Sequence, residues 1–295
     1  TMPILGNVLL RGTGDKLLLV SSDLEVEIST KVNHSTDIGI NTTMPARKLL
    51  DILKSLPGSK PVDIEINDKK AIIKSGKSKF TLATLPGADF PYKTQTTEFK
   101  FTATAADFDR LICQTGFSMA TQDARHFLNG MFLETSKTNL TVVATDGHRL
   151  SMSSCAAQNN TDDPVTCIIP RKCITEIKRI LTTFKDNKEN IIEFTIENKE
   201  IIIQIDNFIV RSKLIEGNYP DYKKVFPESL PHKLNVNKQD LKSALQRMSI
   251  LSNDQFKGVK LSLNKTDMVL STNNPSLEEG EDSIACSYSG ESFDI

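Results

Sequence analysis

The chain of 295 residues is longer than one ordinary hydrophobic core supports, so its length favours two or three domains. Its composition, with 38% hydrophobic and 25% charged residues, excludes a collagen, a coiled coil and a disordered chain. A formal net charge of -1 predicts no affinity for nucleic acid by itself, so any such affinity must come from the distribution of the charge.

The sequence predicts no membrane anchor, no bound metal and no cofactor. No apolar run reaches the ~20 residues of a membrane span, and no signal-peptide segment opens the chain, which indicates a cytoplasmic protein. The five cysteines are odd in number and include no C-x-x-C pair, which argues against a disulfide framework and a zinc ribbon. We expect free thiols, mostly buried.

In chain order, the first predicted elements are strands at 6–10 and 17–23 and a helix that begins after Pro45. Apolar residues at helical spacing over 49–56 give this helix one buried face, and a Pro-Gly pair at 57–58 ends it. A helix at 105–119, strands at 130–134 and 140–144, a helix at 171–181 that Pro170 starts, and a strand at 201–205 follow. A helix at 238–251 and strands at 258–262 and 268–274 complete the set, with linkers near 94–98 and 227–232.

These elements repeat along the chain. Gly6, Gly130 and Gly258 each open a similar strand, at intervals of 124 and 128 residues, and Pro45 and Pro170 precede similar helices 125 residues apart. The segment 85–92 also resembles 214–222. The repeat predicts an α+β protein of three homologous domains at 1–97, 98–231 and 232–295, each with helices on one side of a mostly antiparallel sheet. Its length also predicts that the first domain lacks its beginning and the third its end.

Basic residues concentrate on the predicted helices, whereas the acidic residues at 278–282 lie elsewhere. The basic positions are Arg47, Lys48, Lys54, Arg171, Lys172, Lys178, Arg179, Lys238, Lys242 and Arg247. If the helices share one side of three similar domains, their charges form a positive surface that attracts phosphates without reading bases. The alternative is an ordinary solvated helix face in each repeat.

Five motifs carry a resemblance to a known family, the β subunit of bacterial DNA polymerase III, or sliding clamp. They are Thr145-Asp146-Gly147-His148-Arg149-Leu150, Phe127-Leu128-Asn129-Gly130-Met131, Pro170-Arg171-Lys172, Tyr219-Pro220-Asp221-Tyr222 and Ile250-Leu251-Ser252-Asn253. The resemblance covers essentially the whole chain. Relative to the family pattern, about 25 residues at the start and about 70 at the end are missing, judged from the repeat length.

The resemblance implies a DNA polymerase processivity factor without catalysis of its own. Such a protein is a ring-shaped, head-to-tail homodimer that encircles and slides on duplex DNA regardless of sequence. Its expected partners are the DNA polymerase III α subunit, the clamp loader, and other polymerases and repair proteins, which bind a cleft through short linear motifs.

The resemblance also implies three groups of site residues. The expected DNA contacts are Arg47, Gln122, His126, Phe127, Arg171 and Lys172, with His126 in place of the usual Tyr. The expected partner-peptide cleft comprises Leu128, Thr145, Gly147, His148, Arg149, Leu150, Pro220, Lys224 and Val225, with Lys224 in place of the usual Arg. The expected dimer interface joins Lys48, Lys77, Lys79, Phe80 and Leu82 to Ile250, Leu251, Glu278, Glu279 and Asp282.

Two other interpretations were weighed. An enzyme would use His148 as a general base oriented by Asp146, but the sequence offers no nucleophile motif, P-loop or metal-ligand cluster to accompany them. A static nucleic-acid-binding or scaffold protein would use the same basic helices without a ring. High salt should strip such a protein from circular DNA, whereas a closed ring stays trapped.

Overall fold

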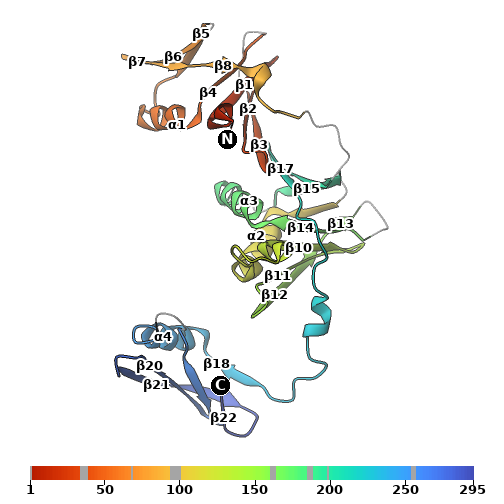
Figure 1. Cartoon of the computed structure of the whole chain (residues 1–295), viewed down its shortest axis with the longest axis vertical. Coiled ribbons are helices and arrows are strands. Elements are labelled where there is room, and N and C mark those ends of the chain that lie inside the picture. Colours follow the sequence, from red (N-terminus) through yellow and green to blue (C-terminus); the bar gives the residue numbers. More distant parts are fainter. Residues whose placement is uncertain are drawn as a thin grey trace. The chain divides into compact units, whose positions relative to one another are not determined.

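The computed structural model describes residues 2–33, 39–67, 69–93, 101–159, 164–184, 189–197, 199–253 and 257–295. The chain divides into two compact units, Thr1–Pro220 and Asp221–Ile295 (Figure 1). The predicted linker at 94–98 lies outside the described residues. Among the described helices, none has the length and apolar character that crossing a bilayer requires.

A ten-stranded sheet runs through the first unit, in the order β13-β9-β15-β16-β17-β3-β2-β1-β4-β8. Its strands from the first part of the chain are β1 (Asn7–Thr13), β2 (Lys16–Ser22), β3 (Val26–Asn33), β4 (Asn41–Pro45) and β8 (Leu85–Pro86). Its later strands are β9 (Phe101–Thr104), β13 (Gln158–Asn159), β15 (Ile191–Glu197), β16 (Glu200–Ile205) and β17 (Phe208–Lys213). The pairing of β3 with β17 joins the two groups into one sheet.

Two smaller sheets complete the strands of the first unit. One contains β5 (Asp63–Asn67), β6 (Lys70–Ser75) and β7 (Ser78–Ala83), with β7 at an edge. The other contains β10 (Gly130–Thr135), β11 (Asn139–Thr145), β12 (Leu150–Ala156) and β14 (Thr166–Pro170), with β12 and β14 at its edges. The strand pairs of the described residues are antiparallel throughout, in agreement with the expected mostly antiparallel sheets.

Three α-helices bury one face each in the first unit: α1 (Ala46–Ser55), α2 (Ala105–Thr115) and α3 (Arg171–Thr183). Pro45 and Pro170 directly precede α1 and α3, where a missing backbone N–H costs nothing. Thr104 caps α2, because its hydroxyl accepts from the Asp107 N–H at 3.1 Å. Ile174, Ile177 and Leu181 of α3 are buried in one core, as their spacing predicted.

The main core of the first unit lies around α2 and α3. Phe101 and Phe194 stack with ring centroids 4.6 Å apart, and Phe108 meets Phe194 edge-on at 5.0 Å. This packing holds the helices against strands of both neighbouring sheets. This packed core therefore supports the loop that follows α2 and the turn that follows β11.

The second unit is one five-stranded sheet with one α-helix. Its elements are β18 (Leu234–Val236), α4 (Lys238–Met248), β19 (Lys260–Leu263), β20 (Asp267–Asn273), β21 (Glu279–Tyr288) and β22 (Phe293–Asp294). Asn237 caps α4, since its side chain accepts from the N–H groups of Gln239 and Asp240. Ala244 and Met248 of α4 pack on Met268 and Leu270 of β20. The predicted helix and strands are present, and the helix ends three residues before Leu251.

Candidate functional site

Three of the expected DNA contacts, Gln122, His126 and Phe127, lie on the loop that joins α2 to β10. The side chain of Asn129 closes this loop, because it donates to the Asp123 carbonyl and accepts from the Asp123 N–H, both at 2.9 Å. Gln122 adopts a left-handed backbone conformation, with φ of 58°. Gln122 and His126 are exposed, whereas Phe127 is half-buried. The loop thus presents two polar side chains that can reach phosphate oxygens.

The cationic residues of this group are already bonded. Arg171 donates to the carbonyl of Met119 at 2.8 Å, which ties the start of α3 to the start of the loop. Lys172 forms ion pairs with Asp23 at 2.5 Å and Glu25 at 3.1 Å, and the contact with Asp23 raises its pKa. Arg47 lies on α1, where it pairs with Asp51 at 3.4 Å. Among the described residues, no hydrogen bond or ion pair joins Arg47 to the other predicted contacts.

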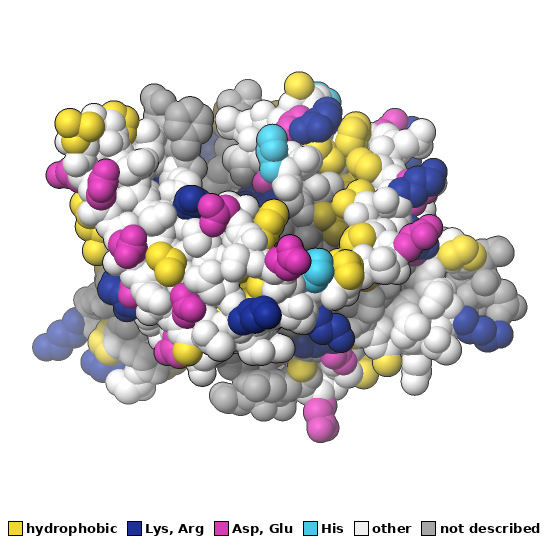
Figure 2. Space-filling model, turned by 90° about the horizontal axis from the view of Figure 1, so that it is seen from below, with side chains coloured by type: hydrophobic (Ala, Val, Ile, Leu, Met, Phe, Trp, Pro, Cys, Tyr) yellow, Lys and Arg dark blue, Asp and Glu magenta, His cyan; other side chains and the backbone are white. Residues whose placement is uncertain are grey.

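Other helical cations also have acidic neighbours. Lys178 pairs with Asp109 at 3.2 Å, Arg179 with Glu176 at 3.1 Å, and Arg247 Nε with Asp282 at 2.8 Å. On the face seen in Figure 2, basic and acidic side chains are intermixed. The helices therefore carry less free positive charge than the sequence pattern predicts.

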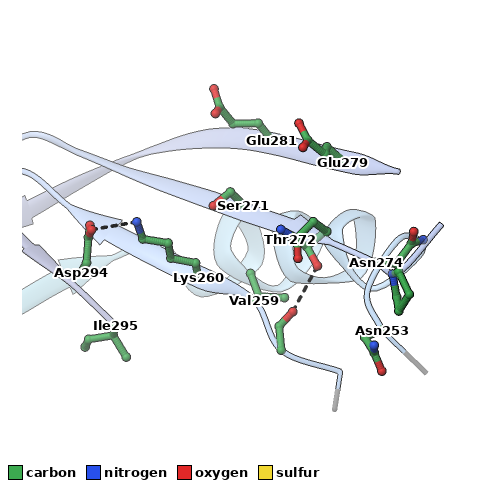
Figure 3. A pocket seen from close by; sticks show the side chains of 14 residues that line it. Asn253, Val259, Lys260, Ser271, Thr272, Asn274, Glu279, Glu281, Asp294 and Ile295 are labelled. Atoms are coloured by element: carbon green, nitrogen blue, oxygen red, sulfur yellow. Dashed lines mark hydrogen bonds and ion pairs between the residues drawn. The ribbon is translucent and has the colours of Figure 1, made fainter. Parts of the chain in front are cut away.

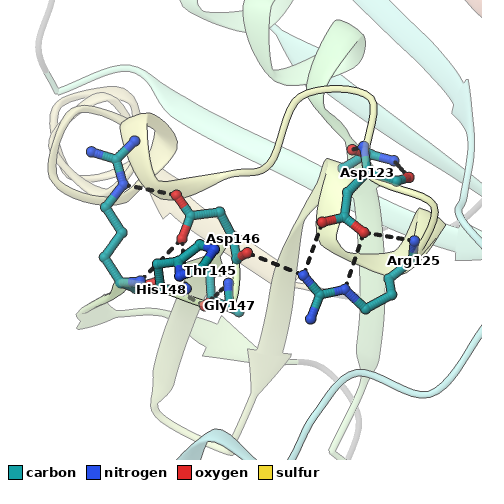
Figure 4. Close-up of polar contacts among 8 residues, drawn as sticks. Asp123, Arg125, Thr145, Asp146, Gly147 and His148 are labelled. Carbon is teal, nitrogen blue, oxygen red and sulfur yellow. Dashed lines mark hydrogen bonds and ion pairs between the residues drawn. The ribbon is translucent and has the colours of Figure 1, made fainter. Parts of the chain in front are cut away.

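Asp146 organises the second group, on the turn between β11 and β12 (Figure 4). Its carboxylate accepts from the N–H groups of His148 and Arg149 at 3.0 Å each and from Arg149 Nε at 3.0 Å. These bonds lower the pKa of Asp146. Asp146 thus binds the backbone of His148, so it shapes a turn instead of orienting a general base.

Two further contacts fix the shape of this turn. Thr145 donates its hydroxyl proton to the Arg149 carbonyl at 2.7 Å and accepts from the Gly147 N–H at 3.0 Å. Gly147 has φ of 90°, a conformation that favours glycine. Arg149 also donates to the carbonyl of Phe117 at 2.8 Å, and its guanidinium lies over the Phe117 ring. The turn is therefore preformed and joined to the loop after α2.

The residues of the expected partner-peptide cleft differ in their exposure. Leu128 and Thr145 are buried and Leu150 is half-buried, whereas Gly147, His148, Arg149 and Pro220 are exposed. Lys224 and Val225 belong to the second unit, where Lys224 pairs with Asp221 at 3.2 Å and Val225 is 64% exposed. The first unit alone thus contains seven of the nine predicted cleft residues.

The third group lies on β7, α1 and the second unit. Lys48, Lys77 and Lys79 are exposed, but Leu82 is 8% exposed and packs with Leu49 and Ile73 in a core that Phe80 borders. The edge strand β7 therefore offers its backbone and Lys79, with Lys77 in the turn just before it, while Leu82 of the same strand packs into the core.

In the second unit, Ile250 is 78% exposed, and Glu278 and Glu279 are also exposed. Leu251 is half-buried, and its Cδ1 lies 3.5 Å from the position that a Cβ would take at Gly280. Asp282 is bound by Arg247, which the sequence did not indicate as its partner.

A hollow of about 1130 Å³ lies beside these acidic residues in the second unit (Figure 3). Its lining mixes polar and apolar groups, with Lys260 paired to Asp294 at 2.8 Å and Thr272 donating to the Gly258 carbonyl at 3.1 Å. Glu279 and Glu281 stand at its border. Within the described ranges, no group of three or more His, Cys, Asp or Glu side chains is placed to hold a metal ion.

Sequence reasoning missed the acid–arginine pairs that hold the two loops. Asp123 binds Arg125 through both carboxylate oxygens, at 3.0 and 2.9 Å, and this contact lowers the pKa of Asp123 to about 2. The available signal was an aspartate two or three residues before an arginine in a loop, a spacing typical of turns in which a carboxylate accepts from backbone N–H groups.

Comparison with known families covers almost all of this chain. Residues 1–94, 102–221 and 223–295 match the N-terminal, central and C-terminal domains of the DNA polymerase III beta subunit. The curated beta sliding clamp of Proteus mirabilis is 39% identical over 299 residues, which cover 100% of this chain and 80% of that protein. The beta sliding clamp of Escherichia coli K12 is 38% identical with the same coverage.

Solved structures agree with this assignment. The DNA polymerase III subunit beta of Pseudomonas aeruginosa superposes with a TM-score of 0.92 at 38% identity, covering 100% of this chain and 80% of that one. A sliding clamp of the same organism bound to griselimycin gives a TM-score of 0.92 at 39% identity, covering 100% and 79%. The predicted three-domain clamp fold is confirmed. The chain therefore belongs to the DNA polymerase III β subunits, the bacterial sliding clamps, which are processivity factors of DNA polymerase and not enzymes.

Proposed function

We propose that this protein acts in the cytoplasm as a ring-shaped homodimer that encircles duplex DNA and tethers polymerases to it. The observation that carries the proposal is the match of the whole chain to the three β-subunit domains, with a TM-score of 0.92 to a solved clamp. We place the domain boundaries at 97/98 and 231/232. The partners of the cleft are the DNA polymerase III α subunit, the clamp loader, and other polymerases and repair proteins with short linear motifs.

The DNA contacts in this proposal are Arg47, Gln122, His126, Phe127, Arg171 and Lys172. The exposure of Gln122 and His126 on a closed loop supports the assignment. Because Arg171 and Lys172 already bind protein acceptors, their attraction for phosphate is partly neutralised. Retention on DNA is therefore topological more than electrostatic.

The partner-peptide cleft comprises Leu128, Thr145, Gly147, His148, Arg149, Leu150, Pro220, Lys224 and Val225. The preformed turn around Asp146 supports this assignment, because a peptide that binds an ordered turn loses less conformational entropy than one that must order it. The exposed Val225 adds an apolar anchor point on the second unit.

The dimer interface pairs Lys48, Lys77, Lys79, Phe80 and Leu82 with Ile250, Leu251, Glu278, Glu279 and Asp282. An exposed Ile250 with neighbouring glutamates on one side, and an edge strand with lysines on the other, are complementary in polarity and charge. A heterologous contact of this kind closes into a ring when it repeats with the right rotation.

The decisive experiment is retention on circular DNA. The predicted interfaces are crosslinked around a nicked circular plasmid, which is then washed in high salt. Retention on the circle with release on linearisation is expected for a closed ring. Loss during the wash would instead identify a static electrostatic binder.

A further inference from the structure

One arginine joins the proposed DNA-contact loop to the proposed cleft turn (Figure 4). Arg125 Nε and Nη2 donate to the two carboxylate oxygens of Asp123 at 3.0 and 2.9 Å. The same Nη2 donates to the backbone carbonyl of Asp146 at 3.3 Å. Asp123 follows Gln122 in the loop, and Asp146 precedes Gly147 in the turn. The Arg125 guanidinium therefore bridges the two segments, in addition to the contact of Arg149 with Phe117.

Gly147 makes room for this guanidinium. A Cβ at Gly147 would stand 3.0 Å from Arg125 Nη2 and 3.1 Å from Nη1, closer than real Cβ contacts allow without movement of the neighbour. The guanidinium thus lies directly against the backbone of the turn. The Asp146 carboxylate accepts from the N–H groups of His148 and Arg149 inside the turn, and the Asp146 carbonyl accepts from Arg125 of the neighbouring loop.

Part of the Arg125 guanidinium remains exposed beside these bonds. The Arg125 side chain is 53% exposed, and in the described part of the chain its Nη1 has no hydrogen-bond acceptor. Gln122 and His126, the exposed residues of the same loop, flank Arg125 in sequence. A phosphate drawn to this loop can accept from Nη1 without breaking the bonds to Asp123 and Asp146.

We propose that Arg125 is a positioning residue that couples DNA contact to peptide binding. The inference rests on the proposed function of the loop and the turn. The bonds of Asp146 and Thr145 already set the internal shape of the turn, so what Arg125 governs is the movement of the whole turn relative to the loop. A phosphate bound at Nη1 restricts the guanidinium and so limits this movement. A partner peptide then meets a turn whose position has lost this freedom, so DNA tightens peptide binding. By linkage, the peptide tightens DNA contact by the same factor.

The test compares peptide affinity in two states of the full chain. A fluorescent synthetic peptide with the clamp-binding motif of the DNA polymerase III α subunit is titrated against free clamp and against clamp crosslinked closed on a nicked DNA circle. We expect Kd to be at least about fivefold lower on DNA. Arg125→Met should reduce this ratio to about one. Arg125→Lys should leave an intermediate ratio, because lysine keeps the charge but lacks the planar fork.

Arg110→Met is the matched control. Arg110 binds Asp107 at 3.1 Å and the carbonyl of Ser154 at 3.1 Å, and its side chain is 42% exposed, so it makes the same kind of contact away from the turn. We expect this variant to keep the wild-type ratio. Because each ratio compares one variant with and without DNA, a general loss of stability does not change it.

Three outcomes overturn the coupling: a wild-type ratio of one, an unchanged ratio in Arg125→Met, or an equal loss in Arg110→Met. Failure of the proposed function looks different. In that case the wild-type clamp binds no peptide in either state, or leaves the circle in high salt.

Discussion

Glu27 lies on β3 directly opposite Arg211 of β17, where the two strand groups of the ten-stranded sheet meet. Arg211 Nε is 3.9 Å from the Glu27 carboxylate, and both side chains are only 12% exposed. Burial raises the pKa of Glu27 to about 7, more than the neighbouring Arg211 lowers it. The ionised carboxylate is therefore poorly solvated at neutral pH.

This pKa predicts how stability depends on pH. Between pH 4.5 and 7 the folded chain binds a proton at Glu27 that the unfolded chain has lost, so the free energy of unfolding falls as pH rises. In Glu27→Gln this part of the pH dependence should disappear, and at pH 8 the variant should be more stable than wild type by roughly 2 kcal/mol. Arg211 keeps its ion pair with Glu200 at 3.1 Å in the variant.

Urea unfolding at pH 5 and pH 8 measures the effect. Glu65→Gln is the control, because Glu65 pairs with Lys74 on the surface and its side chain is 52% exposed. That variant should keep the wild-type difference between the two pH values. An identical pH dependence in Glu27→Gln and wild type would show that Glu27 ionises normally.

At the scale of elements, α4 ends just before the most exposed apolar residue of the proposed interface. Ile250 follows the helix and is 78% exposed. Ile250→Arg should raise the dimer dissociation constant at least about thirtyfold, because it places a charge where an apolar contact is lost. Sedimentation velocity across a dilution series measures this dissociation constant.

Met152→Arg provides the matched substitution on another element. Met152 lies on β12, is 46% exposed and is not among the proposed interface residues. It should remain dimeric at the same concentrations. A dimer in both variants would remove Ile250 from the interface.

The elements that the sequence predicted well are those with a local period. Ile174, Ile177 and Leu181 of α3 lie 3 or 4 residues apart and are buried, and Pro170 marks the start of the helix within one residue. The joining of β3 to β17 was not predictable in this way, because Glu27 and Arg211 are distant in sequence and no turn fixes their register.

The site residues show the same contrast between features set by local sequence and features set by tertiary contacts. The resemblance of the motif 145–150 led to the proposed cleft turn, and the structure shows that the Asp146 carboxylate sets the shape of this turn. The partner of a long charged side chain is often set by tertiary packing, so the pairing of Lys172 with Asp23 was not visible in the sequence. The burial of Leu82, a residue of the edge strand β7, also depends on tertiary packing and was not predictable from the sequence.

For the whole molecule, pairing of the helical cations limits how strongly the protein binds DNA that it does not encircle. The net charge is -1, and Lys172, Lys178 and Arg179 each face a carboxylate. Each such cation must leave its partner before it can replace a counterion on DNA. Affinity for linear duplex should therefore be low and weakly dependent on salt, whereas retention on a circle depends on ring closure.

Freeing one cation tests this argument. The double variant Asp23→Asn with Glu25→Gln removes both anionic partners of Lys172, while Asn keeps an oxygen for the backbone N–H of Val26. It should bind linear duplex more tightly, and the slope of log K against log salt should steepen by about 1, the effect of one more phosphate contact. Glu216→Gln frees Lys199, which pairs with Glu216 at 2.7 Å outside the proposed contacts, and should leave the slope unchanged. Equal slopes in all three proteins, measured by fluorescence anisotropy, would show that Lys172 does not face the DNA and would leave the contact to Gln122 and His126.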